Sequence, residues 1–208
     1  MALVSNSTRR PWGVGLIRWS ATLPEMERPF RTTPTPSSCP SGTRRPGPIA
    51  QGRGLPVDLP GGGRRCAKQA DSLGADVIVA QGTEAGGHGA LRGTLPLVPA
   101  IVDAVGPTPV LAAGGIGDGR GLAAALALGA AGAVVGTRLC ASEESLMHPA
   151  AKARPVAATG DQTVRARVFD QVRGLAWPSR FTVRALRNRF LDRWEDQGEG
   201  LEDDPGRA

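Results

Sequence analysis

The chain has 208 residues, a length that suits one domain or one domain with appendages. Its formal charge of +6 and its sequence pI of about 10.4 raise nucleic acid as a partner. The positive charge is almost all arginine, because Lys68 and Lys152 are the two lysines. The sequence has no tyrosine, no dense basic block with interleaved aromatic residues, and no zinc-finger or RRM signature, so we expect no specific nucleic-acid binding.

The cysteines and the hydropathy pattern exclude further classes of protein. Cys39, Cys66 and Cys140 are odd in number and widely spaced, and no CxxC occurs, which argues against a disulfide framework and a zinc site. No apolar run reaches the roughly 18 residues of a membrane span, and no apolar segment of a signal peptide follows Arg9-Arg10. We therefore expect a cytoplasmic protein with no metal site and no membrane contact.

The N-terminal part of the chain loses its periodicity after one short strand pattern. Pro11–Ile17 predicts a short strand with glycines where another group comes close. From about Thr22 to Arg65 neither a helical nor a strand period occurs, and half of the 18 prolines lie here. Proline blocks helices and central strands, and so few large apolar residues cannot offset the entropy of ordering. Residues 22–65 are therefore predicted to be disordered or loosely draped.

The middle segment, residues 66–151, repeats strand, loop and helix three times. The predicted strands are Ala75–Ala80, Val110–Ala113 and Ala133–Val135. The predicted helices are Cys66–Gly74, Leu95–Val105, Arg120–Leu128 and Glu143–Ala151, with Gly74 and Gly129 as C-caps. This order is typical of a parallel α/β arrangement with right-handed crossovers.

Glycine-rich loops follow the predicted strands, and loops at the carboxyl ends of parallel strands carry the chemistry in α/β folds. Gly114–Gly119 follows one strand and Gly136-Thr137 the next, which is how a (β/α)8 barrel forms a phosphate site from its last two strands. An open sheet is the alternative, but the spacing of Gly115–Gly119 does not match GxGxxG. In the first loop, His88 can exchange a proton near neutral pH, although a solvated or capping histidine fits the same pattern.

The C-terminal segment, residues 152–208, mixes arginine with apolar residues. Phe181, Ala185, Phe190 and Trp194 have nearly helical spacing, so Arg180–Trp194 predicts an amphipathic helix. We expect this helix to pack on the barrel or on a subunit partner, in preference to a membrane or a nucleic acid. A homodimer is therefore left open.

These motifs together give the chain a family resemblance. ADVIVAQGTEAGGHG (Ala75–Gly89), PVLAAGGIGDG (Pro109–Gly119) and GAVVGTRL (Gly132–Leu139) resemble the nitronate monooxygenase family, formerly called 2-nitropropane dioxygenases. Arg167–Phe190 is similar to the C-terminal region of some members. The resemblance covers about Ala67–Trp194 and implies an FMN-dependent TIM barrel that oxidises alkyl nitronates or nitroalkanes with O2.

The resemblance also implies a role for individual residues. Gln81 and Gly86 line the flavin, and Gly115, with Gly114 beside it, holds the FMN phosphate after the penultimate strand. His88 is the base that removes the α-proton of a nitroalkane, or it lies against the bound nitronate. A phosphate dianion requires converging N–H donors and no obstructing Cβ. The residues that complete this cradle are Val134, Val135, Gly136 and Thr137.

The chain departs from the family before Cys66. Pro11–Ile17 resembles the third barrel strand, so residues 1–21 are interpreted as a remnant of an early strand, with Gly15 where many members have asparagine. The fourth and fifth strands should lie within the proline-rich stretch, and we hypothesise that residues 22–65 are an out-of-frame translation or a gene-model error. We therefore predict a partial (β/α)8 barrel that consists of its last strands. The alternatives are a flavin-dependent enoyl-ACP reductase-like enzyme and a non-catalytic fragment.

Overall fold

The structure is a computed structural model that describes residues 63–72, 75, 77–89, 91–175 and 177–195. The predicted strand Pro11–Ile17, the C-cap at Gly74 and nearly all of the stretch 22–65 lie outside these residues. The exception is 63–65, because the first described helix, α3 (Gly63–Ser72), begins three residues before the predicted position.

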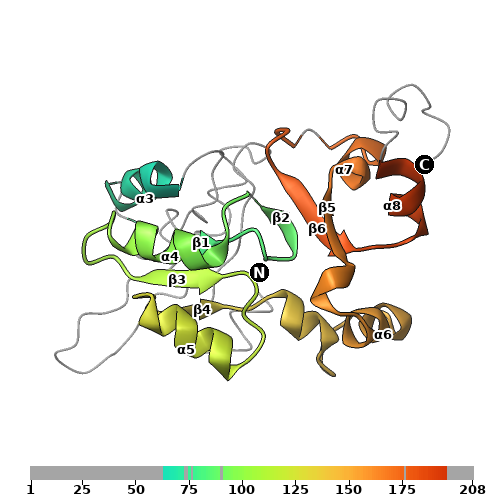
Figure 1. Ribbon diagram of the computed structural model, residues 1–208, viewed down its shortest axis with the longest axis horizontal. Helices are drawn as coiled ribbons and strands as arrows, with labels where there is room; N and C mark the ends of the chain where they lie inside the picture. Colours follow the sequence, from blue (N-terminus) through green and yellow to red (C-terminus); the bar gives the residue numbers. More distant parts are fainter. Residues whose placement is uncertain (1–62, 73–74, 76, 90, 176, 196–208) are drawn as a thin grey trace, which may run out of the picture.

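A three-stranded parallel sheet forms the first half of the described fold (Figure 1). It consists of β1 (Ile78–Gln81), β3 (Val110–Ala113) and β4 (Gly132–Val134), in the order β1-β3-β4. β1 pairs with β3 from Ile78↔Val110 onward, and β3 pairs with β4 from Leu111↔Gly132 onward. The predicted parallel α/β arrangement is confirmed, and the carboxyl ends of the three strands lie at one edge of the sheet.

The helices of this half pack against the parallel sheet and share one core with it. α4 (Thr94–Val102) contacts β1 and β3, α3 contacts α4 and β1, and α5 (Gly119–Ala127) contacts β4. Burial alternates along β1, where Ile78 and Ala80 are fully buried and Val79 and Gln81 are half-buried. Helices thus cover one face of the sheet, as in the wall of a (β/α)8 barrel. The buried core residues of this cluster include Leu97, Val98, Ile101, Val110 and Ala112.

Local residues explain where α5 begins and ends. Asp118 is the N-cap, and its carboxylate accepts hydrogen bonds from the backbone N–H groups of Arg120 (3.0 Å) and Gly121 (3.1 Å). Gly129 follows the helix with φ +91°, a backbone conformation that glycine adopts without a Cβ penalty. The C-cap predicted from the sequence is therefore confirmed at Gly129.

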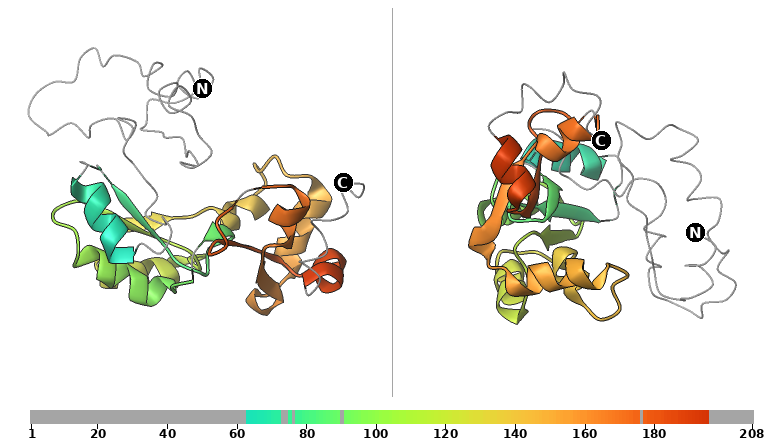
Figure 2. Two further views of the ribbon diagram at one scale, coloured as in Figure 1. Left: turned by 90° about the horizontal axis from the view of Figure 1, so that it is seen from above. Right: turned by 90° about the vertical axis from the view of Figure 1, so that its right-hand side faces the viewer.

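A three-stranded antiparallel sheet forms the second half. Its order is β2 (Gly87–Gly89), β6 (Thr182–Leu186) and β5 (Thr163–Ala166). His88 pairs with Val183, and Val164 pairs with Ala185. β2 follows β1 within a few residues, so the two sheets lie beside each other along the molecule (Figure 2).

The prediction of one helix over Arg180–Trp194 is wrong. Residues 182–186 form β6, and the helix α8 is confined to Arg189–Trp194. Thr182 and Val183 are β-branched, and backbone pairing with both β2 and β5 outweighs the weak helical period. Asn188 then starts α8, because its side chain accepts hydrogen bonds from the N–H groups of Phe190 (3.0 Å) and Leu191 (3.1 Å).

The helix that connects the two halves begins and ends later than the sequence predicts. Glu143–Ala151 was expected to be helical, but α6 spans Pro149–Ala157. Pro149 disfavours helical backbone at the residue before it and suits the first helical turn, which explains the later start. The remaining elements are the 3-10 helices η2 (Thr137–Ala141) and η3 (Gly160–Gln162) and the helix α7 (Val168–Val172).

The second half has a small core of its own. Ala166, Val168 and Leu191 are buried there, and the rings of Phe169 and Phe190 stack with centroids 5.5 Å apart.

In the part of the chain that the structure describes, no helix has both the length and the hydropathy needed to cross a bilayer.

Candidate active site

The loop after β1 connects the two sheets. Gly82 donates its N–H to the carbonyl of Ala113 (2.8 Å), and Ala85 donates to the carbonyl of Gly82 (3.1 Å), which turns the chain back. The side-chain Nε2 of Gln81 donates to the backbone carbonyl of His88 (2.7 Å). The loop that starts in the parallel sheet therefore ends in β2 of the antiparallel sheet, with His88 as the middle residue of that strand.

The loops after β1 and β3 lie against each other. Gly114 and Gly115 both have positive φ, +106° and +73°, where glycine is strongly favoured. A Cβ at Gly114 would lie 2.8 Å from the backbone nitrogen of Ala85, and one at Gly115 would lie 3.1 Å from Cβ of Glu84. Both glycines are thus required by backbone conformation and by close approach.

The loop after β4 meets the same segment. A Cβ at Gly86 would lie only 2.3 Å from Oγ1 of Thr137, the first residue of η2. A Cβ at Gly136 would meet nothing within 4 Å, and the side chains of Val134 and Val135 are exposed. The structure therefore brings together Gly86, Gly114, Gly115 and Thr137, with 134–136 at the end of the neighbouring strand.

These residues fit a phosphate group. The backbone N–H groups of Gly115 and Gly136 donate to no acceptor in the part of the chain that the structure describes. Both N–H groups belong to glycines, which have no Cβ to keep an anion away from the backbone, as anion-binding loops require. The first N–H groups of α5, by contrast, are occupied by the carboxylate of Asp118, so the free donors are in the loops after β3 and β4.

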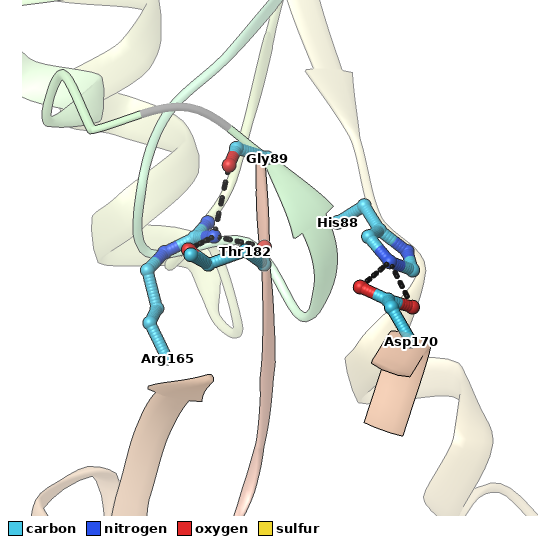
Figure 3. Close-up of polar contacts among 5 residues, drawn as sticks. All are labelled: His88, Gly89, Arg165, Asp170 and Thr182. Carbon is cyan, nitrogen blue, oxygen red and sulfur yellow. Dashed lines mark hydrogen bonds and ion pairs between the residues drawn. The ribbon is translucent and has the colours of Figure 1, made fainter. Parts of the chain in front are cut away.

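His88 contacts two residues that the sequence patterns did not single out. Its Nε2 lies 2.9 Å from Oδ1 and 2.9 Å from Oδ2 of Asp170, which is on α7 (Figure 3). Its imidazole stacks on the ring of Trp177 with centroids 3.6 Å apart and an interplanar angle of 2°. The residues are 82 positions apart along the chain, and the one local signal was a carboxylate within the apolar stretch Val168–Val172.

Two arginines hold the loop from the antiparallel sheet. Arg165 on β5 donates from Nε to the carbonyl of Thr83 (3.0 Å) and from Nη1 to the carbonyl of Gly89 (3.0 Å), as Figure 3 shows for Gly89. Arg184 on β6 donates from Nε to the same carbonyl of Thr83 (2.8 Å). Charge-assisted bonds of this kind are stronger than neutral ones. The loop is therefore fixed at both ends by the C-terminal strands.

Glu84 fixes the middle of the loop to α4. Its Oε2 accepts hydrogen bonds from the backbone N–H and from Oγ1 of Thr94, both at 2.8 Å. Partial burial opposes ionisation of this carboxyl, but the two bonds from Thr94 and the charge of Arg184 outweigh it, so its pKa is lowered. At neutral pH Glu84 is thus an anion that ties the loop to the start of α4.

Comparisons with known proteins find one family model and several similar proteins and structures. The family model for nitronate monooxygenase matches residues 64–199. The nitronate monooxygenase npaC of Metarhizium robertsii is 46% identical over 137 residues, which cover 62% of this chain and 38% of that protein. FabK of Thermotoga maritima has a TM-score of 0.57 at 37% identity, over 66% of this chain and 43% of that chain. The nitroalkane oxidase of Streptomyces ansochromogenes has a TM-score of 0.55 at 33% identity, over 65% and 39%.

The parallel sheet and its helices form part of a TIM barrel, as the solved structures of similar fold indicate. The chain spans less than half of the length of each of these three proteins. The family model nevertheless covers more than half of the 208 residues, and the chain therefore belongs to the nitronate monooxygenase family.

Proposed function

We propose that the chain carries the FMN-binding half of an oxidoreductase that oxidises alkyl nitronates or nitroalkanes with O2. The observation that carries the proposal is the meeting of three strand-end loops at one edge of the parallel sheet. Gly86 lies against Thr137, Gly114 lies against Ala85, and His88 is two residues beyond Gly86. Family membership supports the same chemistry.

In this proposal the loop residues bind and orient the cofactor. Gly114 and Gly115 hold the phosphate, because their N–H groups can approach it without a Cβ in the way. FMN, when bound, supplies the redox chemistry, including electron transfer to O2. Gln81 and Gly86 line the flavin, and the residues that complete the phosphate cradle are Val134, Val135, Gly136 and Thr137.

His88 is proposed to handle the proton. The α-proton of a neutral nitroalkane is acidic because the nitro group stabilises the anion, and an imidazole accepts such a proton near neutral pH. The side chain of His88 is 22% exposed, so it is held by its neighbours and still reachable. A nitronate has already lost this proton and needs His88 only as a contact.

The first test is the visible spectrum and the melting curve of the purified full chain. Bound flavin colours the protein yellow, and FMN at 100 times its dissociation constant should raise the free energy of unfolding by about 2.7 kcal/mol. The second test is O2 consumption with an alkyl nitronate in the absence of NAD(P)H. Consumption of NAD(P)H with an enoyl thioester would instead assign the reductase.

The chain covers less than half of the length of its relatives, and this partial coverage favours a second candidate, a fragment without catalysis. Such a fragment would purify colourless, and added FMN would leave its melting temperature unchanged. A cytoplasmic location and a homodimer stay predictions. Size-exclusion chromatography with light scattering measures the oligomeric state, and fractionation of the source cells measures the location.

A further inference from the structure

Asp170 is a buried carboxylate with one prominent partner. It is 5% exposed, and among the described residues it is the one charged side chain that is buried. Both of its oxygens lie 2.9 Å from Nε2 of His88. Burial of a carboxylate is costly unless a donor compensates for it, so this pair is a specific feature of the fold.

The geometry sets which imidazole nitrogen carries the proton. An ionised carboxylate only accepts hydrogen bonds, so Nε2 of neutral His88 is assigned as the N–H donor, and Nδ1 then carries the lone pair. Trp177 packs flat on the ring and restricts its rotation out of this plane. Figure 3 shows the imidazole directed at the carboxylate of Asp170.

We propose that Asp170 is a positioning residue that holds His88 as the Nε2–H tautomer, so that Nδ1 is the atom that accepts the substrate proton. This inference rests on the proposed oxidation of nitroalkanes. In the step, the α C–H bond of the neutral nitroalkane breaks and an N–H bond forms at Nδ1. The electron pair of the C–H bond moves into the nitro group and gives the nitronate, while the carboxylate stays ionised and contacts the imidazolium.

A purely structural tie between β2 and α7 would behave differently. Such a tie would affect stability equally whichever substrate is present, and it would place no requirement on the tautomer. The positioning role instead separates two substrates, because a neutral nitroalkane needs proton removal and its preformed nitronate does not. The positioning role also predicts that a change at Asp170 affects the imidazole of His88 alone. The imidazole of His148 has a different partner, because it accepts a hydrogen bond from the backbone N–H of Ala150.

The first readout needs no flavin. The chain has two histidines, so long-range ¹H–¹⁵N spectra of the imidazoles resolve the tautomer of His88 with His148 as internal reference. Wild type should show Nε2–H at His88. In Asp170→Asn the new amide can donate to Nε2, and the Nδ1–H form should replace it at His88 alone, whereas Asp170→Glu should retain the wild-type form.

The second readout is kcat/KM for a neutral nitroalkane and for its preformed nitronate. Asp170→Asn should lower turnover of the neutral nitroalkane by about 10²–10⁴-fold and leave turnover of the nitronate close to wild type. Asp170→Glu should recover much of the loss. The control is Asp192→Asn, which removes an exposed carboxylate that pairs with Arg187 and should leave both substrates unaffected.

The outcomes separate the two proposals. Equal losses on both substrates, or a His88 tautomer that does not respond to Asp170→Asn, overturn the positioning role. Wild type that turns over neither substrate overturns the proposed function, and the imidazole spectra then decide the role of Asp170 alone. If Asp170→Asn does not fold, an Nδ1–H tautomer in wild type overturns the inference and an Nε2–H tautomer supports it.

Discussion

The close approach of Gly86 and Thr137 can be tested by adding one methyl group. A Cβ at Gly86 would lie 2.3 Å from Oγ1 of Thr137 and 3.3 Å from both Cβ and Cγ2 of the same residue. Real Cβ atoms essentially never make a contact as short as the first of these distances, so Gly86→Ala must either push the loops after β1 and β4 apart or turn the side chain of Thr137. The substitution introduces no left-handed strain, because Gly86 is not among the glycines with positive φ.

The magnitude follows from this contact. Overpacking by one methyl group costs about 1–3 kcal/mol, and a lower value is expected if Thr137 rotates about χ1. Thr137→Ala removes Oγ1 and Cγ2 from an exposed side chain and should alter stability by less than about 0.5 kcal/mol. In the double variant the nearest remaining atom is Cβ, at 3.3 Å, so most of the loss should be recovered. The expected coupling is about 1–2 kcal/mol.

Denaturant unfolding of the four proteins in this double-mutant cycle measures the coupling. Gly136→Ala is the matched control, because a Cβ there meets nothing within 4 Å and should leave the free energy of unfolding almost unchanged. If Gly86→Ala and Thr137→Ala are additive, the two loops do not touch. The shared cradle after β1, β3 and β4 would then be wrong.

Three further predictions concern single residues. His88→Ala should lower turnover of a neutral nitroalkane by about 10²–10⁴-fold, as measured by O2 uptake, and unchanged turnover would remove His88 as the base. Because the pKa of Glu84 is lowered, its carboxylate stabilises the fold above the ordinary value of 4.5 and loses this contribution as the pH falls through the lowered pKa. Melting temperatures from neutral to acidic pH should therefore fall less steeply for Glu84→Gln than for wild type, and parallel curves would contradict the assignment. Gly129→Ala should cost about 1–3 kcal/mol in denaturant unfolding because of its φ of +91°, whereas Gly106→Ala, with open space and no positive φ, should cost little.

The parallel half of the fold could be predicted because its signals are local. The strand Val110–Ala113 is observed with the predicted bounds, since a short apolar run lies between Pro109 and Gly114. Gly129 could be predicted as a cap because a glycine ends an alanine- and leucine-rich helix. Burial of parallel strands under helices follows from the same pattern.

The antiparallel half could not be predicted because its pairing is not local. β6 gains its backbone partners from β2, which is more than ninety residues earlier, and from β5. A window of the sequence around Arg180–Trp194 contains neither partner, so the weak helical spacing alone determined the prediction of a helix. Asp170 could not be predicted as a site residue for the same reason, because its partner His88 lies 82 positions away. The site residues after β1, β3 and β4 could be named because each follows a strand within a few positions, and their roles stay predictions.

The division of the chain at residues 151 and 152 also stays a prediction, and the candidate site draws on both sides of it. The loop after β1 comes from the parallel half, but Arg165 and Arg184 bind its carbonyl at Thr83, and Asp170 binds the imidazole of His88. His88 itself lies on β2, a strand that pairs with β6 of the antiparallel sheet. The glycines that suit a phosphate are thus supplied by the loops after β3 and β4, and the imidazole that suits a proton follows β1, while the C-terminal strands and α7 determine where that imidazole points. A chain that lacked the C-terminal half would keep the glycine loops and lose the orientation of His88.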